Sequence, residues 1–227
     1  MNQNSEVTKN AAVSVSLYGR AEIHIPKRTY IIVGNGRGGT SMVAGAVAAL
    51  GISITPAVRS LNYEDAEIVN AAQGRLADGT KMETTRDENI ASVRSIIAAR
   101  NETSDIWGWK DPSADLYLRD VFDCLRNPHF IFVWRDVAAV ATAQLALEPS
   151  LDPLTAMQGP LGRLNRYFAL INECACPTLM VSYERAKSKP NLLTRDLASF
   201  TGVTVNEQMA GVIERFVSPT GGYRELA

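Results

Sequence analysis

Short apolar runs alternate with longer amphipathic stretches over most of the chain. The apolar runs lack the period-two alternation of half-buried strands, and we expect buried strands at residues 29–33, 52–54, 130–134 and 178–182, with one more ending at Lys110. Helices are expected between them, at residues 40–50, 63–77, 87–100, after Asp136, and at 153–173, 189–201 and 205–216. Strands separated by helices indicate a parallel sheet covered on both faces. The pattern therefore predicts an α/β fold, a three-layer sandwich around a central, mostly parallel sheet.

The first residues follow this pattern poorly. Residues 1–27 alternate only weakly, so we expect an N-terminal arm that contains at most a short strand or hairpin. Residues 28–227 are then expected to form a single domain.

Ligands of open α/β sheets bind beyond the carboxyl ends of the strands. The segments that directly follow the predicted strands are therefore the candidate site: Gly34–Ser41, Lys110–Asp111, Arg135–Asp136 and Tyr183–Glu184.

The stretch "YIIVGNGRGGTSMVAGAVAALG" passes from a predicted strand through a glycine-rich turn into a predicted helix. Gly34, Gly39 and Ser41 match the spacing of the triphosphate-binding loop G-x-x-x-x-G-K-[ST]. The lysine position holds Thr40, and the cation of the loop is Arg37. Amides and hydroxyls at a helix N-terminus suit a compact phosphate group.

The same glycines also satisfy the dinucleotide fingerprint G-x-G-x-x-G. Arg59 lies near the position where an NAD-binding fold carries an acidic residue, which leaves an NADP-binding oxidoreductase as an alternative. A phosphotransferase would need a strand-end acid to hold Mg²⁺. Strand 130–134 is followed first by Arg135, and Asp136 is interpreted as a helix N-cap. The site therefore collects cations without a clear metal carboxylate, as sulfuryl transfer would allow.

Bulk composition excludes several classes of function. The chain has 227 residues, 46% of them hydrophobic and 21% charged, with a formal net charge of −1. No basic field recruits nucleic acid, no apolar run spans a bilayer, and the polar N-terminus lacks a signal-peptide core. Three cysteines without metal spacing are expected to be buried or inert thiols. We therefore expect a cytoplasmic protein without nucleic-acid or membrane partners.

Five motifs in order resemble the family of sulfotransferases that use 3′-phosphoadenosine 5′-phosphosulfate (PAPS), in its bacterial and carbohydrate-acting branch. The likeness covers about residues 28–222 and rests on "GNGRGGTSMVAGAVAALG", "LNYEDAEIVNAAQ", "WGWKDP", "FIFVWRDVAAVATAQ" and "LMVSYERAKSKP". It implies a P-loop-like nucleotide-binding fold, with PAPS as the sulfuryl donor, the desulfated 3′-phosphoadenosine 5′-phosphate (PAP) as product, and no metal. Two positions depart from the family: Ala143 replaces a serine that holds the 3′-phosphate, and Val137 replaces a proline.

The resemblance implies roles for residues along the cofactor. Those expected to bind it are Gly36, Arg37, Gly38, Gly39, Thr40, Ser41, Arg135, Thr142, Ala143 and Arg224. The loop would hold the 5′-phosphosulfate and Arg135 the 3′-phosphate. Thr142 flanks the departing Ala143, and Arg224 would close over the cofactor from the C-terminal segment.

The expected catalytic residues are Arg37, Glu64 and Lys110. Arg37 would neutralise the leaving oxygen, Lys110 would reach the sulfuryl oxygens, and Glu64 would be the base. Each has an ordinary alternative: Arg37 as a solvated loop arginine, Lys110 in an ion pair with Asp111 or Glu184, and "NYED" as a helix start capped by Asn62. His129 is expected at the wrong end of its strand, and His24 lies in the arm.

The expected acceptor is a hydroxyl or amine of a small molecule or sugar. Residues 55–67 and the helices up to residue 100 should form its wall, and they mix basic with acidic side chains. That mixture does not fit a polysulfated glycan. A non-catalytic or kinase-like P-loop nucleotide-binding protein stays open as an alternative.

Overall fold

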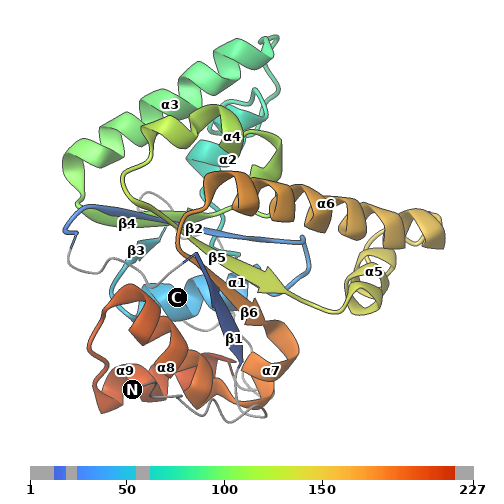
Figure 1. Ribbon diagram of the computed structural model, residues 1–227. Coiled ribbons are helices and arrows are strands. Elements are labelled where there is room, and N and C mark those ends of the chain that lie inside the picture. Colours follow the sequence, from blue (N-terminus) through green and yellow to red (C-terminus); the bar gives the residue numbers. More distant parts are fainter. Residues whose placement is uncertain (1–12, 19–24, 55–61, 218–227) are drawn as a thin grey trace.

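The computed structural model describes residues 13–18, 25–54 and 62–217, which form a six-stranded sheet between two layers of helices (Figure 1). The strand order is β1-β6-β5-β2-β4-β3, and all neighbours are parallel except β1, which runs antiparallel to β6. The strands are β1 (Ser14–Leu17), β2 (Arg28–Gly34), β3 (Ser53–Ile54), β4 (Ile106–Lys110), β5 (Pro128–Trp134) and β6 (Thr178–Ser182). This confirms the predicted α/β sandwich. β1 lies in the segment predicted as an arm with at most a short strand or hairpin, and it forms an edge strand of the sheet.

Helices cover both faces of the sheet. In Figure 1, α2, α3, α4 and α6 lie above it, and α1, α8 and α9 lie below. The helices are α1 (Thr40–Ala49), α2 (Ala66–Ala72), α3 (Arg86–Thr103), α4 (Leu118–Val121), α5 (Val137–Leu145), α6 (Pro153–Cys174), α7 (Tyr183–Ser188), α8 (Pro190–Thr201) and α9 (Glu207–Val217), with 3₁₀ turns at Ala114–Leu116 and Phe122–Cys124. Short α4 and α7 and the 3₁₀ turns were not expected from the sequence.

Two hydrophobic cores lie on the two faces of the sheet. Alternate residues of β2 serve them: Tyr30 and Ile32 pack with α1, α8 and α9, whereas Ile31 and Val33 pack with α2, α3, α4 and α6. Both sets are fully buried. Because each face of β2 is covered, the strand has the continuous apolar run typical of a central parallel strand.

Local capping signals explain most helix starts. Asp136 accepts from the Ala139 amide at 2.8 Å, which confirms the predicted N-cap of α5. Thr85 and Glu88 form a reciprocal capping box at α3. Asp152 caps α6, which continues with a proline.

The helix expected at residues 63–77 is wrong at both ends. α2 begins only at Ala66, because Asp65 and not Asn62 is its N-cap, accepting from the Ile68 amide at 3.0 Å. The Asn62 side chain instead accepts from the Glu64 amide at 3.2 Å. Gly74 follows α2 with φ +63°. Glu64 therefore precedes the helix and does not belong to its first turn.

Within the described parts of the chain, none of the helices combines the length and hydropathy needed to cross a bilayer.

Candidate functional site

The glycine-rich loop runs from the end of β2 into α1. Asn35 is buried, and its carbonyl oxygen accepts from the Gly38 amide at 2.9 Å, which closes a tight turn. Arg37 adopts a left-handed conformation with φ +62°, and its side chain is exposed. Gly39 also has a positive φ, +87°, and is the N-cap of α1 without a side-chain cap. A tight turn with two left-handed residues therefore leads directly into α1.

This loop offers hydrogen-bond donors and no acid. The amides of Met42 and Val43 both bond to the Gly39 carbonyl, so Thr40 and Ser41 carry first-turn amides that a helix cannot satisfy internally. Both residues add hydroxyls, and the first turn of α1 holds no acidic residue. Donors at a helix N-terminus favour an anion. The geometry thus fits the phosphate end of an anionic ligand.

Tyr183, at the start of α7, supports the loop from the neighbouring strand end. A Cβ on Gly39 would lie 2.1 Å from its ring, so only glycine leaves room for this contact. The Arg135 guanidinium lies over the Tyr183 ring, 4.7 Å from its centroid. Arg135 Nη1 also donates to the Arg37 carbonyl at 2.6 Å. Arg135 therefore braces the loop, and among the described residues it forms no ion pair with Asp111 or Asp136.

Lys110 and Glu64 meet at the carboxyl end of β4. The Lys110 ammonium lies 2.6 Å from Glu64 Oε1 and also donates to the Asn62 carbonyl at 3.3 Å. The Lys110 side chain is 3% exposed and that of Glu64 is 33% exposed. Burial lowers the pKa of Lys110, while Glu64 opposes that shift. The expected catalytic pair is thus in direct contact, and the partner of Lys110 is Glu64 and not Asp111 or Glu184.

The neighbouring Asp65 is structural. Its buried carboxylate caps α2 and forms a two-pronged ion pair with Arg100 of α3, which also binds Glu67. Glu64 and Asp65 therefore point to different partners, although the sequence presents them as one acidic pair.

Asp111 is buried in a polar network behind β4. Its carboxylate accepts from the Tyr117 hydroxyl at 2.9 Å and from the Ser113 amide at 2.7 Å. Trp109 donates to the same hydroxyl at 3.2 Å. Burial raises the pKa of Asp111, and it raises the pKa of Tyr117 well above its usual range.

Arg163 of α6 is a cation that the sequence analysis missed. Its Nη1 lies 4.0 Å from the point where a Cβ on Gly36 would stand. Its Nε lies 3.3 Å from the carboxylate of Asp115, which is fully buried and also pairs with Arg166 at 2.7 Å. The ion pair with Asp115 thus holds the Arg163 guanidinium near the loop. No local pattern could have shown this, because it depends on how α6 crosses the sheet.

The other residues named from the sequence lie outside the loop and the Lys110–Glu64 pair. Thr142 and Ala143 are on α5, where the exposed Thr142 hydroxyl donates to the Ala138 carbonyl at 2.8 Å and Ala143 is half-buried. Arg224, Arg59 and His24 lie outside the described residues. His129 is fully buried near the amino end of β5, with Nδ1 2.7 Å from the Asn127 carbonyl, as expected for a core histidine.

The three cysteines form no disulfide, and the described residues contain no cluster of metal ligands. Cys124, Cys174 and Cys176 are free, and burial raises the pKa of Cys174 to about 11 and that of Cys176 to about 12. In residues 13–18, 25–54 and 62–217, no three His, Cys, Asp or Glu side chains are grouped as metal ligands.

No protein-family model matches the sequence, and no curated protein matches it. Among solved structures, the fold is similar to the sulfotransferase domain of the Synechococcus olefin synthase, with a TM-score of 0.55 and 19% identity over 81% of this chain and 76% of that chain. A sugar kinase from Janibacter matches with a TM-score of 0.44 and 15% identity over 80% of this chain and 100% of that chain. The first likeness shows the fold, an α/β sandwich of the P-loop-like type.

Proposed function

We propose that this protein transfers a sulfuryl group from PAPS to a hydroxyl or amine of a small-molecule or sugar acceptor. One observation carries the proposal: a loop without acidic residues, with Thr40 at the position of the triphosphate-loop lysine and Arg37 as its cation, lies at the same end of the sheet as the ion pair of buried Lys110 with Glu64. The first element suits an anionic leaving group, and the second offers a base beside a fixed cation. The fold likeness to a sulfotransferase domain supports this assignment.

The loop residues Gly36–Ser41 would hold the 5′-phosphosulfate with amides, hydroxyls and the Arg37 side chain. Arg135 commits one donor to the Arg37 carbonyl, and a guanidinium has five. Its other donors would meet the 3′-phosphate, with Thr142 in support where Ala143 replaces the family serine. Arg163, held by Asp115, would add a second cation above Gly36. Arg224 stays a proposed contact from the C-terminal segment.

PAPS supplies the sulfuryl group: a bond from sulfur to the acceptor atom forms as the bond to the bridging phosphate oxygen breaks, and its electron pair stays with the bisphosphate. Glu64 accepts the proton of the acceptor hydroxyl. Lys110 keeps the Glu64 carboxylate in place through the 2.6 Å contact and contributes a positive charge. Arg37 offsets the charge that develops on the bridging oxygen, an effect that works only in the transition state.

A thermal-shift panel of PAP, NADPH and ATP–Mg²⁺ tests this function. We expect PAP to raise the melting temperature, since a ligand at a hundred times its Kd stabilises a protein by about 2.7 kcal/mol. PAP binding should be unchanged by EDTA and should weaken as salt rises. Stabilisation by NADPH or only by ATP–Mg²⁺ would assign the loop to an oxidoreductase or a phosphotransferase.

A further inference from the structure

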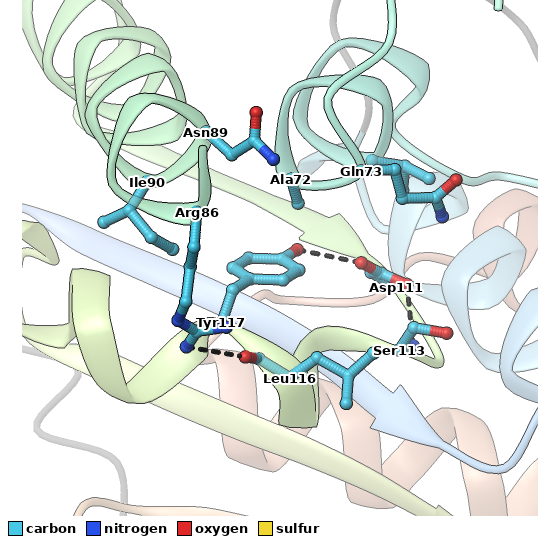
Figure 2. Close-up of a pocket in the computed structure, with 10 residues that line it drawn as sticks. Ala72, Gln73, Arg86, Asn89, Ile90, Asp111, Ser113, Leu116 and Tyr117 are labelled. Atoms are coloured by element: carbon cyan, nitrogen blue, oxygen red, sulfur yellow. Dashed lines mark hydrogen bonds between the residues drawn. The ribbon is translucent and has the colours of Figure 1, made fainter. Parts of the chain in front are cut away.

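A cavity of about 400 Å³ lies between α2, α3 and the segment that follows β4 (Figure 2). Its walls are mainly apolar, formed by Val69, Ala72, Ile90, Leu116 and the Tyr117 ring. Gln73, Asn89 and Asp111 add polar groups, and Figure 2 shows Asp111 and Ser113 together at one end. Sites for small organic ligands are typically of roughly 300–1,000 Å³, apolar, with a few placed polar groups. The cavity therefore fits one small organic molecule.

Two charged side chains line this cavity, those of Arg86 and Asp111. Arg86 is already engaged, because its Nη2 donates to the Leu116 carbonyl at 3.2 Å and lies 2.5 Å from the Asp120 carboxylate. The hydrogen bonds of the Asp111 carboxylate come from neutral donors, the Tyr117 hydroxyl and the Ser113 amide. A carboxylate has about four lone-pair positions, so Asp111 can accept further hydrogen bonds from a ligand. The cavity thus favours ligands that donate hydrogen bonds to the Asp111 carboxylate.

The cavity begins beside the proposed transfer site. Asp111 directly follows Lys110, and its amide donates to the Ile32 carbonyl of β2 at 3.2 Å. The charges of both Glu64 and Lys110 act on its carboxyl group. The polar end of the cavity therefore lies at the sheet edge where the loop and the Lys110–Glu64 pair are found.

We propose that this cavity binds the acceptor, and that the acceptor has an apolar body with a neutral hydroxyl or a cationic amine at one end. The proposal rests on the proposed function and narrows its acceptor class. Asp111 would orient the donor group, while the Gln73 and Asn89 amides would meet neutral polar groups. Anionic acceptors are excluded, because a second negative charge next to a buried carboxylate is strongly disfavoured.

Three probes with the same body test the charge preference: 3-phenylpropan-1-ol, 3-phenylpropan-1-amine and 3-phenylpropanoate. Their dissociation constants would be measured by NMR titration of the full chain saturated with PAP. We expect the alcohol and the amine to bind at least tenfold more tightly than the carboxylate. Equal binding of all three, or no binding of the alcohol, would overturn the proposal.

Two variants test the location. Ala72→Trp should fill the cavity and abolish alcohol binding, while Ala98→Trp, on the exposed face of α3, serves as the matched control. Asp111→Asn keeps the shape and should reduce the discrimination against 3-phenylpropanoate at least several-fold, even if Ala72→Trp does not fold. Alcohol binding that survives in folded Ala72→Trp, or unchanged discrimination in Asp111→Asn, would also overturn the proposal.

PAP binding in the same proteins separates the two hypotheses. Failure of PAP to bind the wild-type chain would remove the proposed function. PAP binding together with the wrong probe preference would leave that function standing and remove only the acceptor assignment.

Discussion

The Arg135 guanidinium donates to the main-chain carbonyl of Arg37 at 2.6 Å, although the two residues lie 98 positions apart. The two arginines are therefore coupled: one holds the backbone from which the other projects. The contact is made at a residue whose φ of +62° lies in the left-handed region. The cation proposed to meet the 3′-phosphate thus also holds the backbone of the cation proposed to meet the leaving group.

Arg135→Ala should impair binding and turnover together. A hydrogen bond from a charged group contributes about 1.5–3 kcal/mol, so PAP affinity should fall about ten- to a hundredfold. Because the loop loses its brace, kcat should also fall. Arg37→Gly, which removes the cation without backbone strain, should mainly lower kcat, by ~10²-fold. Isothermal titration with PAP and steady-state kinetics would measure both. Normal binding and turnover in both variants would show that the site lies elsewhere.

Gly39→Ala should lower the free energy of unfolding by more than the strain of a positive φ alone would. Gly51 has nearly the same φ, +85° against +87°, but nothing within 4 Å of its position for a Cβ, whereas a Cβ on Gly39 would meet the Tyr183 ring at 2.1 Å. Gly51→Ala should therefore cost about 1–2 kcal/mol from conformation alone, and Gly39→Ala about 1–3 kcal/mol more. Urea unfolding measures both.

The Tyr183 ring can be removed to check the cause. In a Tyr183→Ala background, Gly39→Ala should cost no more than Gly51→Ala. PAP affinity should fall with Gly39→Ala and stay unchanged with Gly51→Ala. Equal effects of the two glycine substitutions would show that the ring does not constrain the loop.

Glu64→Gln should lower both activity and stability. Loss of the base should reduce sulfation by at least ~10²-fold. The Lys110 ammonium is then left without its carboxylate in a buried position, which should cost about 1–3 kcal/mol. Glu67→Gln is the matched control, because Glu67 is half-exposed and its partner Arg100 keeps the Asp65 contact. Lys110→Met in the Glu64→Gln background should restore stability but not activity; full activity of Glu64→Gln would remove Glu64 as base.

The sequence predicted the elements whose causes are local. The apolar run at 29–33, the Asp136 cap and the glycine-rich turn each carry their own signal within a few residues, so β2, α5 and the loop were found. The start of α2 was not, since Asn62 and Asp65 are both good caps. Asp65 is the N-cap in the structure, where Arg100, 35 residues away, binds its buried carboxylate.

The contacts of the site depend on packing between distant segments. Glu64 finds Lys110 because the chain before α2 forms a parallel bridge with the end of β4. Tyr183 was predicted to follow a strand end, and the structure places its ring against Gly39 and under the Arg135 guanidinium. Which side chains follow strand ends could be predicted; which of them touch could not.

Stability should depend on pH through Asp111. Burial raises its folded-state pKa above 3.8. Between 3.8 and the raised folded-state pKa the folded protein holds a proton that the unfolded chain has released, so stability falls as pH rises through that window. Asp111→Asn should therefore be stabilising relative to wild type near pH 7, and the difference should vanish below pH 3.8, where the carboxyl group is protonated in both the folded and the unfolded chain. Urea unfolding of both proteins from pH 3.5 to 7 measures this; a difference independent of pH would contradict it.

Arg163→Gln should weaken PAP binding, and Arg166→Gln should not. Both arginines pair with the buried Asp115, so each substitution removes one cation from the same carboxylate and should cost similar stability. Only Arg163 reaches the loop, with Nη1 4.0 Å from the position of a Cβ on Gly36. Loss of one charged contact of about 1.5 kcal/mol should raise the PAP dissociation constant about tenfold. The salt dependence of PAP affinity should also become shallower in Arg163→Gln alone, because fewer charges meet the ligand. If titration calorimetry shows equal PAP affinities in the two variants, Arg163 only anchors Asp115, and the phosphate contacts come from the loop and Arg135.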